Sequence, residues 1–245
     1  MRISWMWLAP IRRLHSLVRV HNAAQWPQAL LKNIELSCSV EEDFITQMEE
    51  TAFLSEIEPH MKRLRYEKTH WDDAIHLYRE REQRRWSDQN GEVLDRMREH
   101  SFPKDAIRLT YVHILDLHKD GRIKPHIDSV RYCGNVITGI SLLSDCVMRL
   151  RHKDKPDVWI ADFLLKRRKF LLFIFSGVGR YEFMHEVLGK EESFFNDLRI
   201  PRDRRISIIC RDLPVPCKSE SDPPELLKLK PLEESEDLIK DKYTN

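Results

Sequence analysis

Ile123-Lys124-Pro125-His126-Ile127-Asp128 is the stretch that most directly determines the fold and the chemistry of this 245-residue chain. In an extended strand, residues i and i+2 point to the same face, so the His126 and Asp128 side chains lie together and Ile127 faces the other way. Both polar groups can then reach a metal ion inside a barrel. Two histidines and one carboxylate on one face of a metal leave three positions open, as in non-haem Fe(II) oxygenase sites.

A third ligand has to come from another strand, and His185 is the candidate, because it follows Tyr181 and Phe183 on one face of a late strand. The chain holds three other His-x-Asp pairs: His70/Asp72, His118/Asp120 and His152/Asp154. The Asp120-Gly121 dipeptide predicts a hairpin turn with solvated polar residues. The pair at 152 lies in a charged loop, and the pair at 70 has no third ligand in a suggestive place. We therefore predict His126, Asp128 and His185 as the metal ligands.

A strand expected at about 204–211 places Arg205, Ser207 and Arg211 on one face. Two cations on one strand face are costly to hold together unless an anion lies between them. A guanidinium pairs bidentately with a carboxylate, so a small dicarboxylate is the expected guest. Arg205 would bind one carboxylate with support from Ser207, and Arg211 would lie nearer the metal. The alternative is that the arginines face solvent and the core is formed by Ile206, Ile208 and Cys210.

The glycines indicate the fold class, because six of the seven lie between residues 121 and 189. Glycine supplies the positive φ values of tight turns, so this half predicts short strands. We expect eight, at about 109–116, 123–128, 135–143, 147–151, 158–165, 169–175, 180–187 and 204–211. A capping box at Ser39–Glu42 and a second start near Ser87 predict two helices. The expected fold is mostly β with flanking helices (α+β): a double-stranded β-helix (jelly-roll) core with a helical N-terminal part.

The ends of the chain differ in composition from its middle. Residues 1–34 carry five basic side chains and no acidic one, interleaved with apolar residues, which is typical of a mitochondrial transit peptide. The alternatives are disorder or a helix docked on the fold. Residues 35–214 are expected to form one domain, with a front part to about 105 and the β-helix core at 106–214. The Pro- and charge-rich residues 215–245 predict a disordered tail.

Overall composition excludes several classes of protein. A formal net charge of +1 gives no argument for nucleic acid or an anionic membrane as partner. Five cysteines without a C-x-x-C pair fit neither a disulfide scaffold nor a four-thiolate zinc site. No run of about 18 apolar residues exists, so no membrane span is expected.

The order His126-x-Asp128, His185, Arg205-x5-Arg211 resembles the motif order of the AlkB-type Fe(II)/2-oxoglutarate dioxygenases. Stretches such as Lys124–Ser129, Gly139–Ser144, Val147–Leu150 and Glu191–Phe195 are similar to one mitochondrial branch of that family, over roughly residues 36–214. The resemblance implies Fe(II) on His126, Asp128 and His185, 2-oxoglutarate held by Arg205 and Arg211, and O2 as the other reactant. It also implies the mitochondrial matrix and a link with programmed necrosis and fatty-acid metabolism.

Two positions depart from the family pattern. Leu115 and Leu117 stand where base-repairing members carry an Asn-x-Tyr that contacts the cosubstrate. Phe173 stands where the branch usually has a tyrosine touching 2-oxoglutarate, and one neutral hydrogen bond is worth about 0.5–1.5 kcal/mol.

The sequence therefore predicts a dioxygenase that hydroxylates an unidentified substrate, a protein or a small molecule. Two alternatives remain open: demethylation of methylated mitochondrial RNA, which the basic and aromatic segment 68–86 could contact, and a non-catalytic binding role. The oligomeric state is not predicted.

Overall fold

The computed structural model describes residues 17–167 and 172–214, and the statements below refer to them. The strands are β1 (Val18–Val20), β2 (Cys38–Glu41), β3 (Glu67–Thr69), β4 (Ile75–Gln83), β5 (Val112–His126), β6 (Ile137–Leu142), β7 (Cys146–His152), β8 (Lys155–Leu165), β9 (Leu172–Phe175), β10 (Phe183–Val187), β11 (Phe194–Phe195), β12 (Leu198–Arg199) and β13 (Arg205–Arg211). The helices are α1 (Gln28–Ser37), α2 (Gln47–Met61), α3 (Asp88–Ser101) and α4 (Gly177–Tyr181), with a 3₁₀ turn, η1 (Ala23–Gln25).

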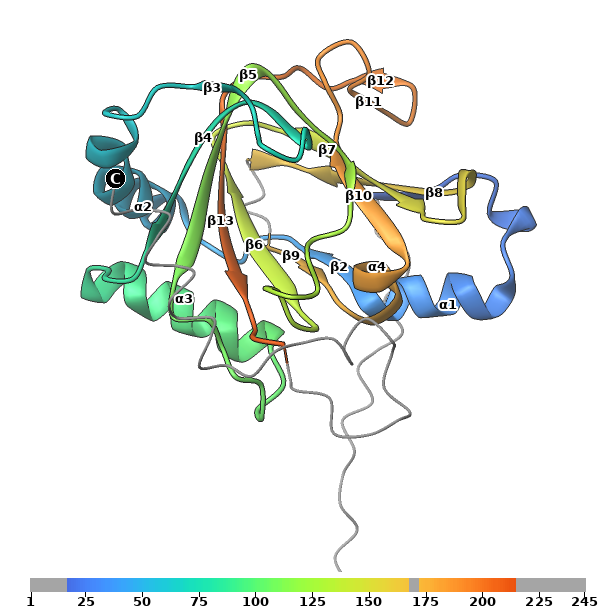
Figure 1. Cartoon of the computed structure of the whole chain (residues 1–245), viewed down its shortest axis with the longest axis horizontal. Coiled ribbons are helices and arrows are strands. Elements are labelled where there is room, and N and C mark those ends of the chain that lie inside the picture. Colours follow the sequence, from blue (N-terminus) through green and yellow to red (C-terminus); the bar gives the residue numbers. More distant parts are fainter. Residues whose placement is uncertain (1–16, 168–171, 215–245) are drawn as a thin grey trace, which may run out of the picture.

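Eleven of these strands form one curled antiparallel sheet, which confirms the predicted fold class, and β11 pairs with β12 in a separate two-stranded sheet (Figure 1). The strand order is β1-β8-β7-β10-β5-β13-β6-β9-β2, and β4 pairs with the other side of β5. Every pairing is antiparallel. Among the described helices, none is long and apolar enough to cross a membrane.

Strand β5 joins the two halves of this sheet. Its first half pairs with β13, where Leu117 lies opposite Arg205, and its last residues pair with β10, where His126 lies opposite His185. A single strand of 15 residues therefore carries the chain from one half to the other. This arrangement brings the ends of three strands that are distant in sequence to one place.

The hairpin turn predicted at Asp120-Gly121 is wrong, because both residues lie within β5. The β4–β5 register shifts between His76 and Tyr78, and a Cβ added to Gly121 would lie 2.7 Å from the carbonyl oxygen of Leu77. Glycine is needed here so that the two backbones can approach closely at a bulge. The Asp-Gly signal therefore marked a bulge rather than a turn.

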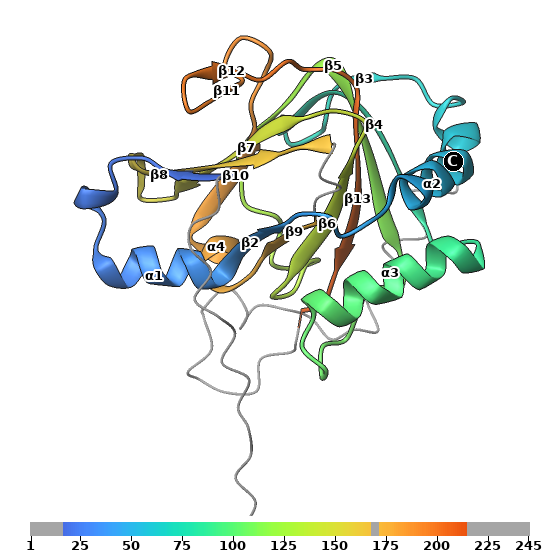
Figure 2. The same cartoon turned by 180° about the vertical axis from the view of Figure 1, so that it is seen from behind.

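Helices α2 and α3 cover the outer face of the sheet beside β4, β5, β13 and β6 (Figures 1 and 2). Their apolar side chains form one core cluster with Ile206, Ile208 and Cys210 of β13. Since Arg205 and Ser207 are also buried, on the opposite face of β13, the alternative of solvent-facing arginines is wrong for Arg205. The arginine face of this strand lines the interior of the barrel.

The first predicted helix begins later than the sequence signal suggested. Residues 38–41 form β2, which pairs with β9, and the capping box is formed by Thr46 and Glu49 at the start of α2. The Thr46 hydroxyl accepts from the Glu49 amide and the Glu49 carboxylate accepts from the Thr46 amide, so a second S/T-x-x-E match was the real one. The second helix, capped by Ser87, is confirmed.

The segment before residue 35 belongs to the folded domain from Leu17 onward. Leu17, Trp26 and Ile34 are at most 5% exposed and join the main core cluster, and β1 pairs with β8. The Trp26 ring stacks on Phe183 at 5.7 Å between centroids. The packed domain thus extends upstream of the expected boundary, whereas the remainder of the predicted transit peptide (1–16) and the predicted tail (215–245) lie outside the described residues.

We predict that a protein starting at residue 35 is much less stable than one starting at residue 17. The point variant Trp26→Ala should cost about 3–5 kcal/mol of unfolding free energy, because a large buried ring is lost. Urea denaturation measures both effects, and Leu36→Ala is the control, because Leu36 is 75% exposed. Equal stability of the two truncations would contradict the packing of residues 17–34.

Candidate functional site

The three predicted metal ligands come together where β5 ends. His126 is the last residue of β5, Asp128 follows it, and His185 lies opposite His126 on β10. One ligand atom from each residue lies within 4.8 Å of the others. Asp128 Oδ1 is 3.4 Å from His126 Nε2 and 3.7 Å from His185 Nε2. Two imidazoles and a carboxylate on one side of a common point fit a non-haem Fe(II) site.

Neighbouring groups orient two of these side chains. His126 Nδ1 lies 2.8 Å from the Lys124 carbonyl oxygen, so it donates there and its Nε2 is left as the ligand atom. Arg211 Nε and Nη2 both lie 3.1 Å from Asp128 Oδ2. This leaves Asp128 Oδ1 directed toward the two histidines. Such contacts around a metal ligand fix its orientation and protonation state.

The electrostatics favour the protonation states that a metal needs at Asp128 and His185, but not at His126. Burial acts to raise the pKa of Asp128, but the charge of Arg211 and the adjacent histidines hold it well below its usual range. Burial, followed by the charge of His126, lowers the pKa of His185 to about 3. Burial acts to lower the pKa of His126 as well, but hydrogen bonding and charge from Asp128 outweigh it and raise that pKa. Near neutral pH, His185 is therefore a neutral donor and Asp128 an anion.

A chain of polar contacts that sequence reasoning missed continues from Arg211. Arg211 Nη1 donates to His113 Nδ1 at 3.0 Å, and His113 Nε2 lies 2.9 Å from Glu80. Glu80 is 3.8 Å from His70 Nε2, and His70 Nδ1 lies 2.6 Å from Asp72. The second half of strand β4, residues 79–83, which includes Glu80, is polar throughout, so apolar alternation could not predict it. The His70/Asp72 pair thus borders the site without being a ligand.

Arg180 of α4 is a second residue that no motif singled out. It is 3% exposed, and its Nη2 donates to the carbonyl oxygens of Cys133 (3.2 Å) and Ser129 (3.5 Å). Both carbonyls belong to the segment that follows Asp128. Arg180 therefore ties this segment to the helix directly before β10, which carries His185.

Arg205 projects into the barrel from the other end of β13. Its side chain is almost fully buried, its Nε donates to Ser141 Oγ at 2.9 Å, and its Nη2 is buried without a hydrogen-bond partner among the described residues. Ser207 is 1% exposed and lies opposite Ser141 in the register. A buried guanidinium with an unused donor, flanked by hydroxyls, fits a bound carboxylate.

Phe173 of β9 is 3% exposed and lies opposite Gly139, which in turn lies opposite Ile209 of β13. A Cβ on Gly139 would lie 2.6 Å from the tip of the Phe173 ring, so glycine makes room for this ring. The structure thus places Phe173 in the barrel core, where it has no polar atom for a ligand.

Arg211, which is expected to bind the cosubstrate, lies beside the metal ligand Asp128. Its described contacts go to Asp128 and His113. These contacts give it a role in orienting a metal ligand, and a direct contact with 2-oxoglutarate stays a prediction.

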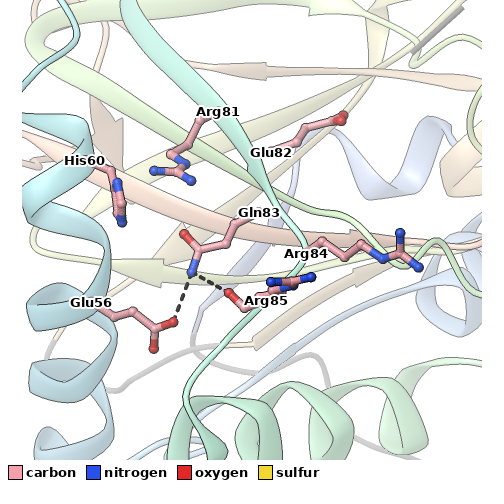
Figure 3. A pocket seen from close by; sticks show the side chains of 7 residues that line it. All are labelled: Glu56, His60, Arg81, Glu82, Gln83, Arg84 and Arg85. Carbon is pink, nitrogen blue, oxygen red and sulfur yellow. Dashed lines mark hydrogen bonds between the residues drawn. The ribbon is translucent and has the colours of Figure 1, made fainter. Parts of the chain in front are cut away.

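A separate hollow of about 620 Å³ lies between α2 and β4 (Figure 3). It is lined by Glu56, His60, Arg81, Glu82, Gln83, Arg84 and Arg85, and by none of the three metal-site residues. The Gln83 amide donates to Glu56 and to the Arg85 carbonyl, both at 3.0 Å. The hollow carries both signs of charge and is distinct from the barrel interior.

A jelly-roll barrel with a His/Asp/His group at its mouth and a buried arginine inside defines the class of Fe(II)/2-oxoglutarate oxygenases. Solved structures agree on the fold. OsALKBH1 has a TM-score of 0.53 and 10% sequence identity, and the match covers 71% of this chain and 97% of that chain. A Pseudomonas putida prolyl-4-hydroxylase has a TM-score of 0.51 and 12% identity, and the match covers 76% of this chain and 98% of that chain. No family model matches the chain.

Two curated relatives identify the family within this class of oxygenases. The chain is 43% identical over 224 residues to the Mus musculus mitochondrial alpha-ketoglutarate-dependent dioxygenase alkB homolog 7, spanning 89% of this chain and 99% of the mouse protein. The Bos taurus protein of the same name is 46% identical over 186 residues, or 76% and 83%. The chain belongs to the alkB homolog 7 family of alpha-ketoglutarate (2-oxoglutarate)-dependent dioxygenases.

We predict that the affinity for Mn(II), an O2-inert substitute for Fe(II), falls as pH falls through the raised pKa of His126. Protonated His126 cannot bind metal, whereas Asp128 stays ionised and His185 neutral, so one proton competes with the metal. Free Mn(II) measured by electron paramagnetic resonance between about pH 8 and about pH 5 tests this. An affinity that stays constant over this range would contradict the assignment of His126.

Proposed function

We propose that this protein is an Fe(II)- and 2-oxoglutarate-dependent dioxygenase in which His126, Asp128 and His185 hold the iron. The observation that carries the proposal is the pairing of His126 with His185 across β5 and β10, with Asp128 directed at both. When bound, Fe(II) and 2-oxoglutarate activate O2, so that one oxygen atom enters a substrate C–H bond and the cosubstrate leaves as succinate and CO2.

The protein's own residues bind the cosubstrate, orient the metal ligands and exclude water. Arg211 neutralises Asp128 and fixes which oxygen faces the metal, and Arg205 with Ser207 anchors the distal carboxylate of 2-oxoglutarate. Apolar side chains of the barrel core, which include Leu115, Leu117, Ile209 and Phe175, would exclude water from the bound cosubstrate. The metal residues themselves are only partly buried, with 12–22% of each side chain exposed, so a substrate can approach from solvent.

We propose a protein side chain or a small molecule as substrate rather than RNA. The aromatic rings of segment 68–86 that would stack on bases are largely packed inside: Tyr78 is 2% exposed, and Trp86 contacts Phe53 edge-on at 5.7 Å. Arg79 is bound to Asp116 at 2.7 Å. Trp71, at 81% exposure, is free for a substrate contact beside His70 and Asp72.

The names of the relatives and the resemblance support a proposal for location and cellular role. The two curated relatives are named mitochondrial, and we propose that this chain acts in the mitochondrial matrix. The resemblance supports a role in programmed necrosis and fatty-acid metabolism. A non-catalytic role is the alternative that the turnover measurement below decides.

We predict that the full chain with Fe(II), ascorbate, O2 and 2-oxoglutarate forms succinate, and that Asp128→Ala reduces this to the enzyme-free background. Asp120→Ala is the matched control, because Asp120 belongs to another His-x-Asp pair on β5 and is partly exposed. Full turnover by Asp128→Ala would contradict the proposed centre. A methylated RNA oligonucleotide that stimulates turnover more than mitochondrial protein or metabolite fractions would favour the RNA alternative.

We predict that Phe173→Tyr tightens 2-oxoglutarate binding between about twofold and about tenfold, which corresponds to one added neutral hydrogen bond. Isothermal titration of the Mn(II)-loaded protein measures it. Phe195→Tyr, a buried substitution on β11 outside the curled sheet, is the control. Unchanged or weaker binding would show that residue 173 does not reach the cosubstrate.

A further inference from the structure

A second buried arginine, Arg202, lies three residues before Arg205 at the same end of the barrel. It is 9% exposed, and its Nε and Nη1 are buried without a hydrogen-bond partner among the described residues. Among the described residues its one hydrogen bond is long, from Nη2 to the carbonyl oxygen of Gly121 at 3.4 Å. Arg205 close by also keeps one unused nitrogen, Nη2.

The two guanidinium groups repel each other. Burial first, and then the positive charge of Arg202, lower the pKa of Arg205. Neither arginine forms an ion pair with a carboxylate in residues 17–167 and 172–214. Two other described arginines do have such partners: Arg204 binds Asp116 and Glu58, and Arg149 binds Asp162.

Two adjacent buried cations without an anion are costly for a folded protein. The chain keeps them although Arg202 contributes little hydrogen bonding of its own. A merely structural arginine would be expected to use its donors, as Arg204 does when its Nε, Nη1 and Nη2 all donate to the carboxylates of Asp116 and Glu58. The free donors and the uncompensated charge indicate an anionic ligand.

We propose that Arg202 and Arg205 together form the subsite for the distal carboxylate of 2-oxoglutarate, with Arg202 as a positioning and specificity-determining residue. This inference rests on the proposed function. Arg205 binds the carboxylate directly, and Arg202 adds a second positive charge that favours a dicarboxylate over a 2-oxo acid with one carboxylate. The ligand in turn relieves the repulsion between the two cations.

The test uses Arg202→Met, which keeps an unbranched apolar stem and removes the charged guanidinium, in the Mn(II)-loaded full chain. We expect the dissociation constant for 2-oxoglutarate to rise about tenfold, because one favourable buried charge is lost from the subsite. Binding of 2-oxobutyrate, which has one carboxylate, should change far less. Arg202→Lys should stay within roughly threefold of the wild type, because it retains the charge. Arg199→Gln, which removes an exposed arginine, is the control.

Thermal unfolding of the ligand-free proteins separates this role from a structural one. Removing an unpaired buried cation should leave the melting temperature of Arg202→Met unchanged or higher, while 2-oxoglutarate should raise it less than in the wild type. Unchanged affinity in a folded Arg202→Met, or its failure to fold, would overturn the role of Arg202. A wild type that binds no 2-oxoglutarate would instead overturn the proposed function itself.

Discussion

The antiparallel register between β5 and β10 is the constraint on which the site depends. It sets His126 opposite His185, and the turn after β5 adds Asp128. Because side chains alternate along a strand, a slip of one residue would turn His185 to the other face and remove it from the group. Two contacts stabilise the segments next to this pairing. Arg151 of β7 binds Glu186 of β10 at 2.6 Å, and Arg180 of α4 binds the segment after Asp128.

Buried positive charge surrounds the metal centre and continues through the barrel. Arg211 and Arg180 lie on the side of Asp128, and Arg205 and Arg202 lie at the other end of β13. Asp128 compensates the charge of Arg211 within the protein, whereas Arg202 and Arg205 have no such carboxylate partner among the described residues. In the proposed function this charge receives the anionic cosubstrate, and the large apolar core, which includes residues from the segment 17–34, offsets its cost in stability.

Much of the site could be predicted from the sequence because its elements obey strand periodicity. The spacing of two residues predicted that His126 and Asp128 lie on one face of a strand. The alternation from Arg205 to Arg211 predicted that these two arginines share a face. The metal and cosubstrate roles of these residues remain predictions, although their geometry agrees. Periodicity could not reveal the polar strand β4, the long strand through Gly121, or the true capping box at Thr46. Nor could it identify Arg180 or Arg202, because tertiary packing alone shows that a charged residue is buried without a partner.

The most direct test of the account is pulsed electron paramagnetic resonance of the Mn(II)-loaded protein, which detects nitrogen nuclei bound to the metal. The account predicts couplings from two imidazole nitrogens, one of which disappears in His185→Ala, whereas His118→Ala leaves both. A spectrum without imidazole nitrogen, or one that His185→Ala leaves unchanged, would contradict the claim that β5 and β10 together build the metal site.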